Sequence, residues 1–273
     1  MAAPHVLILG GHGKIALRLT PLLLQKAWSV TSVIRNPDHE SDIKATATGS
    51  QYSGKLNVLV ESLEDVRSTA DAARVIAAVK PDYIVWSAGA AGKGGPERTF
   101  AIDRDACRYY IDAAAAHPSV TKFLLVSYIA SRRGSPPWWT DADKAAAEHV
   151  NTNILADYFK AKVDADEYLL ARARAAREAG RTFADICLRP GTLSDDDGGE
   201  GVLLGRTGSR GEVSRTDVAR VTAELLETDY RGWVDLLKGS EPVGEAVRRV
   251  ARDQVDCVEG EDLGRINKTE LKL

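Results

Sequence analysis

A tyrosine and a lysine stand four residues apart in the segment Tyr158-Phe159-Lys160-Ala161-Lys162. On a helix this spacing places Tyr158 and Lys162 on one face. A nearby ammonium group favours the phenolate and lowers the pKa of the phenol, so that it exchanges protons near neutral pH. Ser127 follows the apolar run 122–126 and offers a hydroxyl to a substrate oxygen on which charge develops. We therefore predict Ser127, Tyr158 and Lys162 as catalytic residues.

A glycine-rich turn near the N-terminus predicts a phosphate-binding loop. The apolar run 6–9 is typical of a buried strand, and a helical apolar pattern begins at Ile15. Between them, Gly10 permits a tight turn and Gly13 lets the backbone approach a pyrophosphate at the helix N-terminus. A P-loop is excluded because Lys14 is followed by Ile15 rather than by a hydroxyl residue that holds Mg²⁺. An ordinary strand-to-helix turn is the alternative.

The second apolar run, 29–34, ends at Arg35, where an NAD-binding unit usually has an acidic residue. An arginine at this place accommodates a 2′-phosphate, and the first carboxylate after it is Asp38. The sequence therefore favours NADP(H) over NAD, with a solvated loop charge as the alternative for Arg35. The loop 87–95 is rich in small residues, which let a ribose and a nicotinamide lie against the backbone.

Apolar runs alternate with helical patterns through most of the chain. Strands are expected at 29–34, 56–60, 83–86, 122–126 and 184–188, with helices at about 61–79, 99–116 and 153–179. This alternation predicts an α/β fold with a doubly wound parallel sheet, the Rossmann arrangement, whose strands all end at one ligand-binding edge. Shorter strands are expected at 202–204, 211–213 and 233–237, and helices at 216–227 and 242–252. We predict a single domain, 1–273, in which roughly 190–273 form a small substrate-side extension.

The composition excludes several other classes of protein. A hydrophobic content of 44% suffices for a buried core, and a net charge of −3 gives no reason to expect a nucleic-acid or membrane partner. The three cysteines are far apart and the five histidines lack metal-ligand spacing, so neither disulfides nor a metal site is predicted. The first strand begins too early for a signal peptide, and no apolar run has the length of a membrane span. We expect a cytoplasmic monomer or homodimer with a small-molecule substrate.

Taken together and in order, these segments resemble an atypical short-chain dehydrogenase/reductase, in the branch with NmrA-like and biliverdin-reductase-B-like NADP-binding proteins. The resemblance extends from residue 5 to about residue 250 and depends on the set rather than on any single motif. The matching segments are Gly10-Gly11-His12-Gly13-Lys14-Ile15-Ala16, Ile34-Arg35-Asn36, Ser87-Ala88-Gly89, Ile102-Asp103-Arg104-Asp105-Ala106, Ser127, Tyr158-Phe159-Lys160-Ala161-Lys162, Leu188-Arg189-Pro190-Gly191-Thr192-Leu193 and Ser214-Arg215-Thr216-Asp217-Val218-Ala219.

The resemblance implies which residues hold the cofactor. The glycine turn would bind the pyrophosphate and Arg35 the 2′-phosphate, while further residues border the adenine, the nicotinamide-side ribose and the nicotinamide. In chain order the implied cofactor-binding residues are Gly10, Gly11, His12, Gly13, Lys14, Ile15, Arg35, Glu61, Ser62, Leu63, Ala88, Gly89, Ala90, Lys162, Arg189, Pro190 and Thr192. Ser127, Tyr158 and Lys162 would form the catalytic trio.

The chain departs from the family pattern around Ser127. This residue is followed by Tyr128 rather than by a second serine, and it lies 31 residues before Tyr158, far more than in typical short members. The intervening Pro-rich loop contains Trp138 and Trp139. Two adjacent tryptophans do not easily both pack inward, which predicts a flexible apolar lid over the substrate. A loop packed into a local core is the alternative.

We therefore predict an NADP(H)-dependent oxidoreductase that acts on a small carbonyl, quinone or enone. Tyr158 would exchange the proton, Lys162 would lower its pKa, and Ser127 would orient the substrate oxygen. Two alternatives remain open at this point. One is a non-catalytic NADP(H) sensor that binds a partner protein, like NmrA-like relatives. The other is an epimerase or isomerase that keeps its cofactor bound and catalyses no net redox change.

Overall fold

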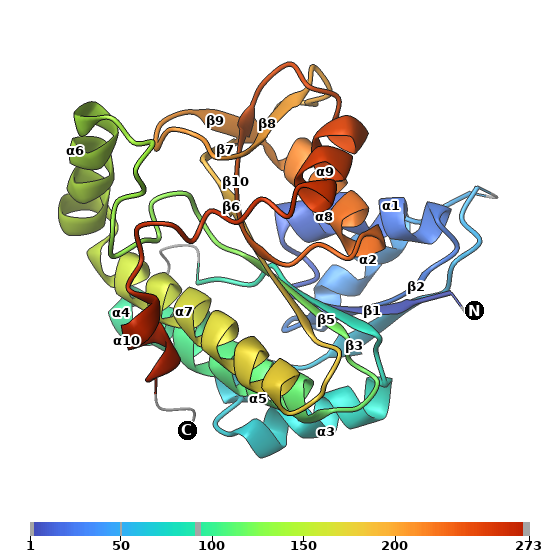
Figure 1. Cartoon of the computed structure of the whole chain (residues 1–273). Helices are drawn as coiled ribbons and strands as arrows, with labels where there is room; N and C mark the ends of the chain where they lie inside the picture. The colour runs from blue at the N-terminus through green and yellow to red at the C-terminus, as the bar shows by residue number, and fades with distance from the viewer. Residues whose placement is uncertain (1–2, 50, 91–93, 270–273) are drawn as a thin grey trace.

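An eight-stranded sheet forms the centre of the protein in the computed structural model, which describes residues 3–49, 51–90 and 94–269 (Figure 1). The strand order is β3-β2-β1-β4-β5-β6-β10-β8, with β8 antiparallel to β10 and the other neighbours parallel. The expected doubly wound α/β fold is confirmed. The strands are β1 (His5–Leu9), β2 (Ser29–Ile34), β3 (Leu56–Val60), β4 (Tyr83–Trp86), β5 (Lys122–Val126), β6 (Ala184–Pro190), β8 (Val202–Gly205) and β10 (Gly232–Lys238).

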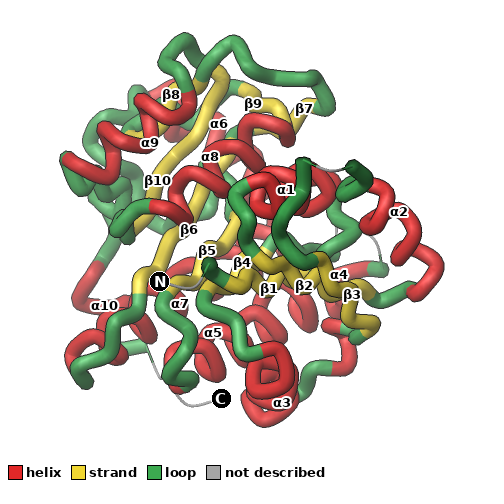
Figure 2. The backbone as a smooth tube through the Cα atoms, turned by 90° about the vertical axis from the view of Figure 1, so that its right-hand side faces the viewer, coloured by secondary structure: helices red, strands yellow, loops and turns green. Residues whose placement is uncertain are grey.

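Helices cover both faces of this sheet, as the view in Figure 2 shows. On one face lie α3 (Thr69–Val79), α5 (Cys107–Ala116) and α7 (Ala156–Glu178). On the other lie α1 (Lys14–Gln25), α8 (Arg215–Glu227) and α9 (Val243–Arg252). None of the helices in the described ranges is long and apolar enough to cross a membrane.

Strand β1 explains why the sheet requires two helical layers. Its residues Val6, Leu7, Ile8 and Leu9 are all fully buried. Because side chains alternate along a strand, Val6 and Ile8 enter the core under α1 and α8, whereas Leu7 and Leu9 enter the core under α3, α5 and α7. A continuous apolar run is thus the sequence signature of a parallel strand covered on both faces.

Shorter elements surround the carboxyl edge of the sheet. A small parallel pair, β7 (Thr192–Ser194) and β9 (Glu212–Ser214), lies beyond β6, and α10 (Leu263–Asn267) contacts α7. The helix after β4 begins as α4 (Gly95–Thr99) and passes through the π-helical segment Phe100–Ala106 before α5. The remaining short helices are α2 (Glu40–Ala45), α6 (Asp141–His149), the 3₁₀ turns Pro37–His39 and Leu63–Asp65, and the π-helical segment Val150–Ile154.

The expected strands 29–34, 56–60, 83–86 and 122–126 have the same bounds in the structure, but several helices differ, among them α3 and α6. The helix expected from residue 61 starts at Thr69, because the Ser68 hydroxyl accepts the Asp71 N–H and caps it there. Helix α6 was not expected. It begins with a capping box in which Thr140 and Asp143 each accept the other's backbone N–H.

Candidate active site

A pocket of about 250 Å³ opens at the carboxyl ends of β1, β2 and β4. The glycine turn forms one wall, because Gly10 adopts a φ of +88° and a Cβ there would lie 2.7 Å from the Ala88 backbone. The Gly11 N–H bonds the Val33 carbonyl at 2.8 Å, which ties the turn to the end of β2. Only glycine permits this approach of β1 to β4, so the predicted phosphate loop has the backbone shape that its role requires.

Arg35 also lines this pocket, with 60% of its side chain exposed. It forms an ion pair with Glu64, and the same carboxylate accepts hydrogen bonds from Arg98 at 3.0 and 3.1 Å. The hydrogen bond from Arg98 lowers the pKa of Glu64 most, and Arg35 adds to this effect. Together they outweigh burial, which would raise it, so the pKa lies below its usual value. Since Glu64 has a second cation, Arg35 is able to turn to another anion without leaving a bare carboxylate.

Two histidines stack beside Arg35. The rings of His12 and His39 lie 3.7 Å apart with an interplanar angle of 15°, and both residues line the pocket. His12 Nε2 lies 2.9 Å from a carboxylate oxygen of Asp42. The loops after β1 and β2 therefore each contribute an imidazole ring to the lining of the pocket.

The predicted catalytic side chains meet at the end of β5. Lys162 on α7 is buried, and its ammonium donates to the Val126 carbonyl at 2.9 Å, directly before Ser127. Tyr158, one turn earlier on α7, is partly buried, and its ring lies 5.3 Å from that of Tyr128. Tyr128 in turn donates to the Asn151 side chain at 2.7 Å. The helix thus presents Tyr158 and Lys162 to one strand end, as their spacing predicts.

Burial opposes the charge of Lys162, but Tyr158, Asp166 and Asp103 outweigh it and raise the pKa of this ammonium. Burial also raises the pKa of Tyr158 to about 12, against the lowering effect of Lys162. The expectation that Lys162 lowers this pKa holds for the pair interaction alone. In the protein without cofactor, desolvation of the phenolate is the larger effect.

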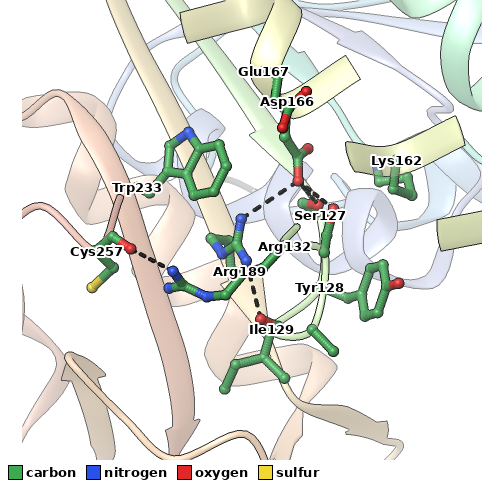
Figure 3. A network of polar contacts seen from close by, with 12 residues as sticks. Ser127, Tyr128, Ile129, Arg132, Lys162, Asp166, Glu167, Arg189, Trp233 and Cys257 are labelled. Carbon is green, nitrogen blue, oxygen red and sulfur yellow. Dashed lines mark hydrogen bonds and ion pairs between the residues drawn. The ribbon is translucent and has the colours of Figure 1, made fainter. Parts of the chain in front are cut away.

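Ser127 is oriented by a buried carboxylate that the sequence analysis missed. Its hydroxyl donates to Asp166 Oδ2 at 2.6 Å (Figure 3). Ser131 donates to the same oxygen at 2.6 Å. A serine hydroxyl has one hydrogen, so Ser127 faces any further partner with its lone pairs. Asp166 follows Lys162 by four residues, and this spacing was the available sequence signal.

Arg189 belongs to a buried chain of charges rather than to the cofactor pocket. Its side chain is fully buried, donates to Asp235 at 3.1 Å and lies 3.6 Å from Asp166. Asp235 also pairs with buried Arg132 at 3.0 Å. Arg132 donates to the Cys257 carbonyl (Figure 3). The resemblance implies that the segment 189–192 passes beside the nicotinamide, and this stays a prediction for its backbone, because the Arg189 side chain is buried in the interior. Its partner Asp235 lies 46 residues later in the sequence.

The structure favours the alternative to a lid, a loop packed into a local core, because Trp138 and Trp139 both pack inward. Trp139 is only 4% exposed, Trp138 is partly buried, and both indoles donate to the Thr207 carbonyl, at 2.9 and 3.0 Å. The Arg132 guanidinium lies 5.3 Å from the Trp139 ring and 5.7 Å from the Trp138 ring. One carbonyl and one buried cation thus hold two adjacent tryptophans in one core, an arrangement that we expected to be difficult.

The structure brings about half of the predicted cofactor residues to the pocket. Those that line it are Gly10, His12, Gly13, Arg35, Glu61, Leu63, Ala88 and Gly89. Those that lie elsewhere than in its described lining are Gly11, Lys14, Ile15, Ser62, Ala90, Lys162, Arg189, Pro190 and Thr192. Residues 91–93 of the predicted loop 87–95 lie outside the described residues.

Other polar and charged side chains line the pocket without having been predicted. They are Asn36, His39, Glu64, Ser87 and Arg98. Asn36 and Glu64 directly follow Arg35 and Leu63, two predicted cofactor-binding residues, and this position in the sequence could have indicated them. Arg98 comes from a helix whose approach to the pocket the sequence does not reveal. The Ser87 hydroxyl is buried without a hydrogen-bond partner in the described structure, which fits a site that receives polar groups of a ligand.

Comparison with known proteins identifies the family. A family model described as NAD(P)H-binding matches residues 10–229. The chain belongs to this NAD(P)H-binding family. Its place in the family agrees with the resemblance to atypical short-chain dehydrogenases/reductases, and a cofactor of the NAD(P) type fits the glycine turn and pocket described above.

Individual relatives of this NAD(P)H-binding protein span nearly its whole length. It is 31% identical over 249 residues to the UPF0659 protein C216.03 of Schizosaccharomyces pombe, covering 88% of this chain and 92% of that one. It is 26% identical to the uncharacterized sugar epimerase YhfK of Bacillus subtilis, covering 90% and 99%. The structure of the oxidoreductase ylbE from Lactococcus lactis superposes with a TM-score of 0.67 at 20% identity, covering 91% and 97%, which shows a shared fold.

Proposed function

We propose that this protein is an NADP(H)-dependent oxidoreductase that moves a hydride between the nicotinamide and a small carbonyl, quinone or enone. The observation that carries the proposal is the placement of Tyr158 and the buried Lys162 at the end of β5. This strand pairs with β4, whose end borders the pocket. A phenol next to a fixed ammonium is suited to exchange a proton with a substrate oxygen. A protein that only senses the nucleotide has no use for this pair.

The pair has separate tasks in this proposal. Lys162, anchored on the Val126 carbonyl, keeps a positive charge behind the phenol and stabilises its anionic form. Tyr158 holds or releases the proton at its hydroxyl, which makes no hydrogen bond to the described residues. The bound cofactor supplies the hydride.

The preference for NADP(H) over NAD(H) rests on the loop after β2. Arg35 is exposed at the pocket wall, and its partner Glu64 is held independently by Arg98. Arg35 could therefore turn to a 2′-phosphate, while Glu64 keeps its ion pair with Arg98. The stacked His12 and His39 add further donors on the same side.

One observation favours a second candidate, a cofactor-bound epimerase. Ser127 presents lone pairs rather than a hydrogen to the site, which suits a substrate hydroxyl that is first oxidised and then reduced again. A relative at 26% identity is named an uncharacterized sugar epimerase. This candidate uses the same Tyr158 and Lys162 but catalyses no net redox change.

Nicotinamide absorbance separates the two candidates. The protein is incubated with NADPH and a panel of menadione, flavins, enones and aldehydes, in parallel with NADH. The oxidoreductase proposal expects NADPH consumption with at least one acceptor, faster than NADH consumption. An epimerase converts a sugar nucleotide at constant absorbance, and a protein that binds NADPH without any turnover contradicts both candidates.

A further inference from the structure

Asp103 is a buried carboxylate that neither the predicted trio nor the pocket lining includes. It lies in the π-helical segment Phe100–Ala106 and is fully buried. Its Oδ2 accepts the Ala90 N–H at 2.9 Å, but its Oδ1 is buried without a hydrogen-bond partner in the described structure. An unpaired buried carboxylate oxygen costs free energy, and its presence in a folded protein needs an explanation, such as a hydrogen bond to a ligand.

The unpaired oxygen lies directly behind the pocket wall. A Cβ on Gly89 would lie only 2.8 Å from Asp103 Oδ1, and both Gly89 and Ile102 line the pocket. The absence of a side chain at Gly89 thus leaves Oδ1 close to the space that a nucleotide would fill. The π-helical turn, a distortion common at functional sites, carries Asp103 at this point.

Asp103 also acts electrostatically on the predicted catalytic pair. Its charge is among the influences that raise the pKa values of Lys162 and Tyr158. Burial raises the pKa of Asp103 itself, and Lys162 partly offsets this. The carboxylate, the ammonium and the phenol therefore form one coupled group at the boundary between α7 and the loop after β4.

We propose that Asp103 is a cofactor-binding residue, whose Oδ1 accepts a hydrogen bond from a hydroxyl of the nicotinamide-side ribose. The inference rests on the proposed use of NADP(H) and adds a residue on the nicotinamide side of the site. The ribose diol is the donor that such a cofactor brings to small residues such as Ala88–Ala90. Lys162, predicted to bond the same ribose, would then approach it together with Asp103.

The variant Asp103→Asn tests this inference with little change of shape. The amide oxygen of the introduced asparagine still accepts the Ala90 N–H, while its NH₂ group replaces the unpaired acceptor with a donor. We expect the Kd for NADPH to rise about tenfold, the loss of one hydrogen bond to a charged group. The Kd for 2′,5′-ADP, which lacks the nicotinamide half, should stay the same.

The Tm of the protein without nucleotide separates a ligand contact from a purely structural role of Asp103, because the loss of a structural contact would lower the Tm. Because burial raises the pKa of Asp103, its ionised form destabilises the folded chain above its ordinary value of 3.8. Asp103→Asn should therefore raise the Tm of the protein without nucleotide at pH 7, and this gain should vanish as the pH falls to 3.8. A more stable variant that binds NADPH more weakly is the signature of a ligand contact.

Asp112→Asn is the matched control, since Asp112 is also buried and pairs with Arg172 on α7 at 2.8 Å, away from the pocket. It should leave both Kd values unchanged. Equal weakening of NADPH and 2′,5′-ADP by Asp103→Asn, or no weakening of either, would overturn the inference. If the unaltered protein bound neither nucleotide, the proposed function would fail and this inference with it.

Discussion

The hydroxyl of Ser127 gives its single hydrogen to Oδ2 of Asp166 across 2.6 Å, within the protein interior. A hydrogen bond to a carboxylate is among the stronger ones in proteins, and Asp166 is itself placed 3.6 Å from Arg189. Ser127 is therefore an acceptor at the site, whereas stabilising a developing oxyanion requires a donor. In the proposed reaction, Tyr158 is therefore the group that would give a proton to the substrate oxygen.

Ser127→Ala should lower kcat/KM for NADPH oxidation by only about tenfold, the loss of one ordinary hydrogen bond. The reduction is modest because the serine donates nothing to the transition state. Steady-state rates with the best acceptor from the panel measure this. A loss as large as that of Tyr158→Phe would show that Ser127 turns its hydrogen to the substrate during the reaction.

Ser131→Ala is the matched control for Ser127→Ala. Ser131 is buried and donates to the same Asp166 oxygen at the same 2.6 Å. Both variants remove an equivalent bond and leave Asp166 with one serine donor. The control should match Ser127→Ala in Tm and the unaltered protein in kcat/KM.

Arg35→Ala should weaken NADPH binding by about ten- to a hundredfold and leave NADH binding unchanged, because only NADPH carries the 2′-phosphate. Titration of each nucleotide against the purified protein gives both Kd values. Glu64→Gln removes the carboxylate that pairs with Arg35 and should tighten NADPH binding. Equal losses for NADPH and NADH in Arg35→Ala would assign Arg35 another role.

Trp139→Ala should destabilise the fold by roughly 3–5 kcal/mol, the usual cost of removing a buried tryptophan. The ring fills a cluster with Ile129, Ala130 and Ala147, and its indole bonds the Thr207 carbonyl. Urea unfolding measures the free-energy difference. If the free energy of unfolding were unchanged and substrate binding altered, the result would instead support the flexible lid that the sequence predicts.

Asp143→Asn should destabilise the protein at pH 7 but not at pH 2. The Thr140 hydroxyl, followed by backbone donors, lowers the pKa of Asp143 from 3.8 to about 2. A carboxylate with a lowered pKa in the folded state contributes stability above 3.8, about 2 kcal/mol here, and loses it as the pH falls through about 2. Urea unfolding at several pH values tests this. A penalty that is equal at both pH values would mean that the charge of Asp143 is irrelevant.

The apolar runs made the sheet predictable. Val6–Leu9 and the other buried parallel strands carry runs of consecutive apolar residues, a pattern that solvent-facing segments lack. Glycines at a strand end then marked the loops that border the pocket. Helix α6 escaped prediction although Thr140 and Asp143 form its capping box, because its exposed surface gives it little apolar periodicity.

The buried polar contacts could not be predicted from the sequence, because they join residues that are far apart in it. Asp166 meets Ser127 across 39 residues, and Arg132 meets Asp235 across 103. The resemblance placed the segment 189–192 beside the nicotinamide, and nothing in the sequence marks Arg189 as a buried charge, since charged residues are usually exposed. Only the folded chain shows that these charges neutralise one another inside the protein.

The central claim is that Tyr158 exchanges the proton of an NADP(H)-dependent reaction, and Tyr158→Phe tests it most directly. The measurement is NADPH consumption with the best acceptor, together with the Kd for NADPH in the same preparation. We predict that turnover falls by at least about a hundredfold, the usual contribution of a positioned acid–base group, while the Kd changes less than about twofold. Undiminished turnover by Tyr158→Phe would contradict the account.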